Sequence, residues 1–207
     1  MASPPPARQG QLFDLSGSSG SDGGPDPLPL LEHQLREWQE RLQAFQAPRF
    51  DEAAGGAASN SRQIELLAGS DADPAAGAAQ LNPLALAARP LQFWRWPDSP
   101  GQGAALYFVI DRPPHLAGPL LLYVGETGQA DRRWKGDHDC KSYLAAYGEA
   151  LQQAGLASGL SIRFWRDAPA AVRPRRALEQ VLIRHWLPPF NKETRGRWAT
   201  PFTAELE

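Results

Sequence analysis

The chain has 207 residues, and 42% of them are hydrophobic, which is enough to bury one core with extra segments around it. A single cysteine, Cys140, excludes an internal disulfide framework and is typical of a reducing compartment. The net charge of −2 is unevenly divided: residues 90–207 carry 15 Lys and Arg against 12 Asp and Glu, whereas residues 1–89 carry 6 against 11. The second half therefore tolerates a polyanion without demanding one.

Neither half contains a stretch that suits a bilayer. The longest apolar run, Ala104 to Ile110, is far too short to cross a membrane, and the N-terminus lacks the apolar stretch of a signal peptide. We therefore expect a cytoplasmic protein with no membrane partner.

The first 90 residues divide into three segments. Residues 1–27 are rich in Ser, Gly, Pro and Asp and are expected to be disordered. An amphipathic helix is predicted at residues 28–47, ended by Pro48. Its apolar stripe repeats at steps of three and four residues: Leu31, Leu35, Trp38, Leu42 and Phe45. Residues 48–90, dominated by Ala, Gly, Ser and Asp, are expected to form a linker.

The amphipathic stripe leaves two interpretations open. The helix either docks on its own domain or serves as a short coiled coil, so that a protein partner or a second copy binds through the Leu31–Phe45 helix. A similar choice applies to the aromatic run Leu91–Trp96, which either covers the core of the following domain or offers a surface on which bases stack.

Residues 91–200 alternate in the manner of a small α+β domain. Strands are predicted at Ala104–Ile110, Pro119–Val124 and Leu160–Trp165, and helices at Gln129–Trp134, Lys141–Ala154 and from Pro174 to Leu187. The order β-β-α-α-β-α predicts a small three-stranded antiparallel sheet flanked by helices.

Two places in this domain carry unusual polar residues. Glu179 lies at the edge of the apolar face of the last helix, where a carboxylate is costly unless it pairs with an arginine or binds a metal ion. Tyr123-Val124-Gly125 ends the second strand, and Arg132 and Arg133 follow on one helical turn. Neighbouring arginines suit a phosphate, although such a pair is also common on a solvated face.

Together these residues resemble the GIY-YIG nuclease family. Tyr107 and Tyr123-Val124-Gly125 resemble the two halves of the family signature, and Arg133 follows Tyr123 by ten residues, where the family's catalytic arginine usually stands. Residues 178–191, Leu-Glu-Gln-Val-Leu-Ile-Arg-His-Trp-Leu-Pro-Pro-Phe-Asn, resemble the family's terminal motif. The resemblance covers roughly residues 91–198 and departs from the signature at Ala105-Leu106, where its Gly and Ile are absent.

The resemblance implies a divalent-metal-dependent endonuclease that hydrolyses DNA. Glu179 would bind one Mg²⁺ or Mn²⁺, Arg133 aided by Arg132 would neutralise the phosphate, and Tyr107 or Tyr123 would accept the proton of the attacking water. Gly125 would hold its loop tight, and Asn191 would orient Glu179 or close the sheet. His138 would have a supporting role. A set of cations would face the DNA backbone. These cations, each of which is otherwise an ordinary surface charge, are Lys135, Lys141, Arg175, Arg176 and Arg184.

Two other functions remain open at this point. One is a nucleic-acid-binding module that keeps the fold without catalysis, and the other is an adaptor that works through the N-terminal helix.

Overall fold

A computed structural model describes residues 32–56, 81–92, 96, 101–134 and 139–202. It confirms the predicted α+β class with a three-stranded antiparallel sheet. The elements follow in the order α1 (Glu32–Gly56), η1 (Pro83–Ala85), β1 (Ala105–Asp111), β2 (Leu120–Thr127), α4 (Ala130–Arg133), α5 (Asp139–Gln153), β3 (Ser161–Trp165), α6 (Val172–Trp186) and η3 (Arg195–Arg197). Across the described residues, no helix is both long and apolar enough to span a membrane.

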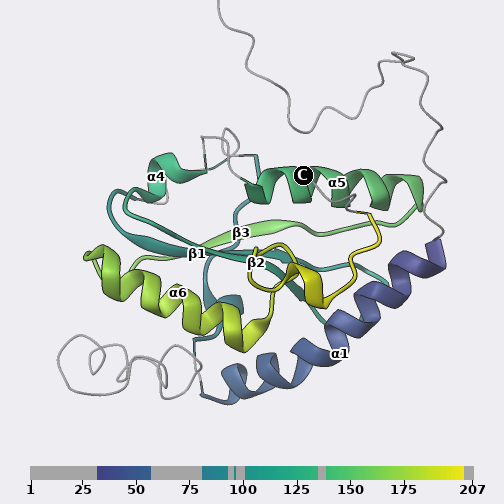
Figure 1. Ribbon diagram of the computed structural model, residues 1–207, viewed down its shortest axis with the longest axis horizontal. Helices are drawn as coiled ribbons and strands as arrows, with labels where there is room; N and C mark the ends of the chain where they lie inside the picture. Colours follow the sequence, from purple (N-terminus) through teal and green to yellow (C-terminus); the bar gives the residue numbers. More distant parts are fainter. Residues whose placement is uncertain (1–31, 57–80, 93–95, 97–100, 135–138, 203–207) are drawn as a thin grey trace, which may run out of the picture.

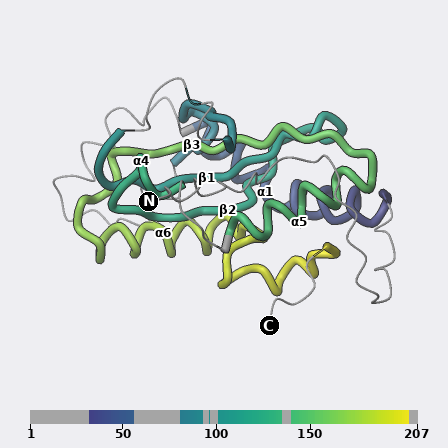
Figure 2. The backbone as a smooth tube through the Cα atoms, turned by 90° about the horizontal axis from the view of Figure 1, so that it is seen from above, coloured from purple at the N-terminus to yellow at the C-terminus, as the bar shows by residue number. Residues whose placement is uncertain are grey.

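The strand β1 lies at the centre of the sheet, in the order β2-β1-β3 (Figure 2). All seven residues of β1 are buried, because helices cover both faces of the sheet and each face needs apolar side chains. The pairing of β1 with β2 slips where Val109 faces Tyr123 and Ile110 faces Leu121, which leaves Leu122 as an extra residue in β2. This β-bulge lets two successive residues, Leu122 and Tyr123, pack against the same core.

Two hydrophobic cores lie on opposite faces of the sheet (Figure 1). One contains α5 through Tyr143, Leu144 and Tyr147. The other contains α6 through Leu182 and Trp186. The two helices therefore pack on opposite faces of the sheet. A side chain of α6 can reach groups on the α5 face only around the edge of the sheet.

The helix α1 belongs to both cores, so the first interpretation of its stripe describes the structure. Leu35 and Trp38 are fully buried on the α5 face, and Phe50 and Ala53 are buried on the α6 face. The helix thus crosses the outer edge of β2. The prediction that Pro48 ends it is wrong, since the helix runs on to Gly56. Burial of Phe50 and Ala53 offsets the proline's cost, which is about 3 kcal/mol in a helix interior.

The expected linker is structured at its far end as well. Arg89 pairs with Ile162 through two backbone hydrogen bonds of 2.9 and 2.8 Å, so the chain before the domain adds to the free edge of β3. Trp96 contacts Phe164 edge to face, as expected of core cover. The segment expected to be disordered, 1–27, lies outside the described residues, as do Phe93 and Trp94 of the aromatic run.

Candidate active site

Tyr107 and Gly125 face each other across β1 and β2. The Tyr107 ring lies over Gly125 so closely that a Cβ on this glycine would come within 2.3 Å of the ring. Gly125 is a strand residue with an ordinary φ, so its expected role of tightening a loop is wrong. Its lack of a side chain instead makes the room in which the Tyr107 ring lies.

The two tyrosines lie beside each other. Their ring centroids are 5.8 Å apart, and the Tyr107 hydroxyl lowers the pKa of Tyr123. Burial raises the pKa of Tyr107 well above its ordinary value and that of Tyr123 to about 12. The charge of Arg133 lowers both pKa values, but in the free protein burial outweighs it.

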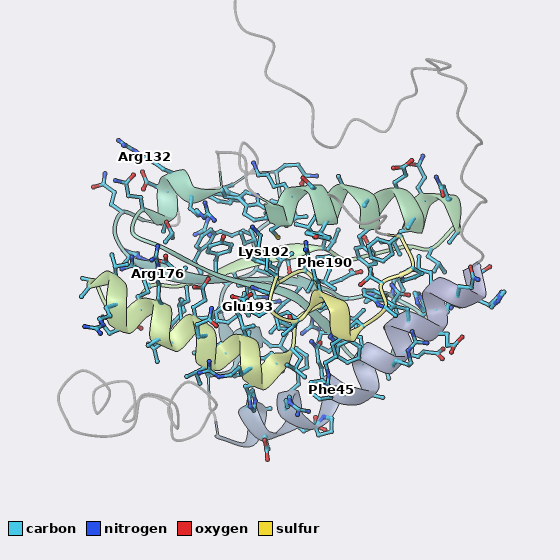
Figure 3. All side chains as sticks on the ribbon, in the orientation of Figure 1. Phe45, Arg132, Arg176, Phe190, Lys192 and Glu193 are labelled. Atoms are coloured by element: carbon cyan, nitrogen blue, oxygen red, sulfur yellow. The ribbon has the colours of Figure 1, made fainter. Side chains whose placement is uncertain are left out.

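Arg133 reaches the tyrosines from α4. Its Nε donates a hydrogen bond of 3.2 Å to the Tyr107 hydroxyl, and its side chain remains half-buried. Arg132, on the same turn, is exposed, and Figure 3 shows it pointing away from the sheet. The structure thus separates the arginine pair: Arg133 faces the site and Arg132 faces solvent.

Glu179 reaches the site from α6, on the other side of β2. The nearby backbone N–H of Glu126 favours the ionised form of its carboxylate and lowers its pKa. The negative charge of Glu179 raises the pKa of the Tyr123 phenol. The positive charge of Arg133 lowers the same pKa. Tyr123 is therefore the group that both the carboxylate and the guanidinium act upon.

The surroundings of Glu179 disfavour its charge. Burial, followed by the negative charge of Glu126, raises the pKa of Glu179 to about 7. Glu193 adds to this, and Arg176 opposes it. A carboxyl group whose ionised form is this unfavourable gains stability from a bound cation.

Glu126 is a site residue that the sequence interpretation missed. Its carboxylate accepts hydrogen bonds from Arg175 at 2.7 Å and from Arg176 at 3.2 Å, and these bonds outweigh burial and lower its pKa. The clue in the sequence was the pair of arginines at the start of a helix, where positive charge opposes the helix dipole. The anion that compensates them is Glu126 of the protein itself.

This arrangement corrects the expectation that Arg175 contacts DNA phosphates. Its side chain is 3% exposed and also donates to the carbonyl oxygens of Pro169 and Ala170, so it holds α6 to β2. Arg176 is 68% exposed at the same end of the sheet and stays accessible to a ligand (Figure 3).

Asn191 closes the sheet rather than orienting Glu179. Its amide accepts a hydrogen bond from Val124 N at 3.0 Å and donates one of 2.7 Å to Val124 O, so it satisfies the outer edge of β2.

The remaining predicted residues are scattered. Arg184 is exposed on the last turn of α6, and Lys141 lies 5.8 Å from the Trp134 ring. Lys135 and His138 lie outside the described residues.

A divalent cation fits the donor set at Glu179 in one way only. No group of three His, Cys, Asp or Glu side chains suited to a metal occurs among the residues that the structure describes. Glu126 is already engaged by two arginines. An ion here would therefore have one protein carboxylate, with water and phosphate oxygens as its other ligands, a set that Mg²⁺ accepts.

Comparisons of the chain with protein-family models, with curated proteins and with solved structures gave no match.

Proposed function

We propose that this protein is a divalent-metal-dependent DNA endonuclease of the GIY-YIG type, acting in the cytoplasm. The observation that carries the proposal is that the charges of Glu179 and Arg133 both act on the Tyr123 phenol, while Arg133 donates a hydrogen bond of 3.2 Å to Tyr107. An acid, a guanidinium and two phenols around one space match the needs of phosphodiester hydrolysis, which are an oriented water, a neutralised phosphate and a stabilised leaving group.

In the proposed reaction, water attacks the phosphorus atom, a new P–O bond forms and the bond to the 3′ oxygen breaks. Arg133 neutralises the non-bridging oxygens as their charge grows, in the manner of other guanidinium–phosphate contacts. Glu179 would hold the Mg²⁺ or Mn²⁺, and the ion would supply Lewis-acid polarisation of the phosphate and of the departing oxygen.

The tyrosines enter this reaction as neutral phenols, because burial raises the pKa of both. A neutral phenol is a poor base, so their first role is to position the attacking water by hydrogen bonds. Only the phenolate form can accept the proton of the attacking water, and a bound cation beside Arg133 would favour that form.

The test is nicking of supercoiled plasmid DNA with Mg²⁺ or Mn²⁺. We expect Arg133→Gln and Tyr123→Phe to slow nicking by about a hundredfold or more, since each removes an oriented group from the transition state. Arg132→Gln, on the same turn but facing solvent, is the matched control and should change nicking by less than about threefold.

Other outcomes identify the two alternatives. Salt-sensitive DNA binding without nicking would support a nucleic-acid-binding module. Absence of any DNA contact would leave an adaptor role. Because α1 is buried in both cores, a partner could bind only its outward-facing side.

A further inference from the structure

A hollow of about 620 Å³ opens where α1 passes η3, and it is lined by Arg41, Phe45, Arg197, Trp198 and Ala199. None of the four proposed catalytic side chains lines it. Figure 3 shows Phe45 on the middle part of α1, away from Arg132 and Arg176. The volume is within the usual range of small-molecule pockets.

The charges around this hollow are unbalanced. Three guanidinium groups surround the Phe45 ring, since Arg49 lies 3.7 Å and Arg197 5.7 Å from its centre and Arg41 lines the same wall. Arg49 is held by the backbone carbonyls of Phe45 and His185. Arg41 forms an ion pair with Glu37, with 3.0 Å between the guanidinium nitrogen and the carboxylate oxygen. Arginines gathered at one aromatic ring, of which Arg41 alone is paired with a carboxylate among the described residues, favour an anionic ligand.

The floor of the hollow is aromatic and rigid. Phe45 and Trp198 meet edge to face with centroids 5.5 Å apart, and the Trp198 indole is fixed by a hydrogen bond of 2.7 Å from its Nε1 to the carbonyl of Leu187. A ligand with a flat, apolar ring therefore finds partners beside the arginines. Phosphate with an adjoining base combines both properties.

The chain also connects this hollow to the proposed active site. Gln180, next to Glu179 on α6, donates a hydrogen bond of 2.9 Å to Glu193, and from there the segment continues through η3 to Trp198. Lys192 and Arg195 are exposed along this segment. This segment thus carries exposed positive charge together with the exposed Glu193.

We infer that the hollow binds an unpaired nucleotide of the DNA substrate, with its phosphate on Arg41 and Arg197 and its base against Phe45 and Trp198. The inference rests on the proposed nuclease function for its choice of substrate. It makes DNA with a single-stranded branch or overhang the preferred substrate over uninterrupted duplex.

The test separates binding from cleavage. The full-length protein is titrated, in EDTA to prevent hydrolysis, against a fluorescein-labelled oligothymidylate of about eight nucleotides, and binding is followed by fluorescence anisotropy. Arg197→Ala and Arg41→Ala should each weaken binding by about tenfold and lower the dependence of affinity on salt by about one ion. Phe45→Leu should weaken it with the salt dependence unchanged, provided that circular dichroism shows the variant folded.

Arg36→Ala is the matched control for Arg41→Ala. Arg36 pairs with Glu32 on the same helix at 2.7 Å, in the same i,i+4 relation as Arg41 with Glu37, and it does not line the hollow. Its loss should leave oligothymidylate binding within twofold of wild type.

Three outcomes overturn the inference: no binding by the wild type, equal weakening in Arg36→Ala, or equally effective competition by a glutamate-rich peptide, which would indicate a site for acidic protein segments. Failure of the nuclease proposal looks different. In that case oligothymidylate binding depends on Arg41 and Arg197, but plasmid nicking is absent. If nicking occurs and the hollow variants bind normally, only the inference fails.

Discussion

Glu179 is a carboxyl group held where its negative charge is disfavoured, by burial and by the neighbouring carboxylate of Glu126. Side chains that perform chemistry are often kept in such unfavourable surroundings, and the fold loses stability as a result. The direction of that loss follows from the pKa. Glu179 ionises near its ordinary 4.5 in the unfolded chain and near 7 in the folded protein, so its unfavourable effect appears as the pH rises through this interval.

We therefore expect Glu179→Gln to be more stable than wild type above pH 7, by about 1–2 kcal/mol after allowance for partial exposure, and equal to it at pH 4.5. Thermal unfolding in EDTA at the two pH values measures this. Glu149→Gln, at an exposed position of α5, is the control and should show no such dependence. A Glu179→Gln variant less stable than wild type at pH 8 would contradict the assignment of a raised pKa.

Gly125 makes a second residue-scale prediction, because its missing side chain leaves room for the Tyr107 ring. Gly125→Ala should destabilise the fold by about 1–3 kcal/mol and slow nicking by about a hundredfold, since it displaces a site group. Gly148→Ala on α5, where nothing lies within 4 Å of the added carbon, should be neutral or stabilising. Wild-type nicking by Gly125→Ala would show that the position of Tyr107 does not matter.

At the scale of elements, the outer edge of β2 explains how α6 contributes to a site on the other face. Its backbone is satisfied in turn by Gln46 at Leu121, Phe190 at Leu122 and Asn191 at Val124. Side chains and one loop amide therefore take the place of a fourth strand. Such covering protects an edge from pairing with another chain and leaves Glu179 beside Tyr123.

Arg175 and Arg176 provide a matched pair for testing how α6 is attached to β2, since both bond to Glu126 but one is buried and the other exposed. Arg175→Ala should destabilise the protein by about 3 kcal/mol, because it leaves Glu126 largely buried without its main partner. Arg176→Ala should change stability by less than about 1 kcal/mol. Denaturant unfolding gives both values, and equal losses would contradict the distinction.

The elements themselves could be predicted from local patterns, but these contacts could not. The apolar run Ala104–Ile110 predicts β1, and the apolar spacing of α6 predicts its helix. Glu126 was missed because its arginine partners lie 49 and 50 residues away in sequence. The raised tyrosine pKa values could not be predicted, because burial, which dominates them, is a property of the folded chain.

At the scale of the whole molecule, α1 is part of the domain that carries the site. The sequence placed the domain boundary near residue 91 because Pro48 normally ends a helix and the Ala- and Gly-rich stretch resembles a linker. What overrides the proline is burial on both faces of the sheet, which local spacing does not reveal.

A chain that begins at residue 81 should therefore fail to fold, because it lacks the fully buried Leu35, Trp38 and Leu42. A chain that begins at Glu32 should fold with the stability of the full-length protein. Circular dichroism and size-exclusion chromatography compare the two. A monomeric, cooperatively unfolding protein from residue 81 onward would show that α1 is an appendage.

The central claim is that Glu179, Arg133 and the two tyrosines form one hydrolytic site. The most direct test compares the rates at which Glu179→Gln and the wild type nick plasmid DNA at pH 8 in Mg²⁺. The variant's expected gain in stability ensures that lost activity does not reflect unfolding. We predict nicking slower by about a thousandfold or more. Nicking within about tenfold of wild type would contradict the claim.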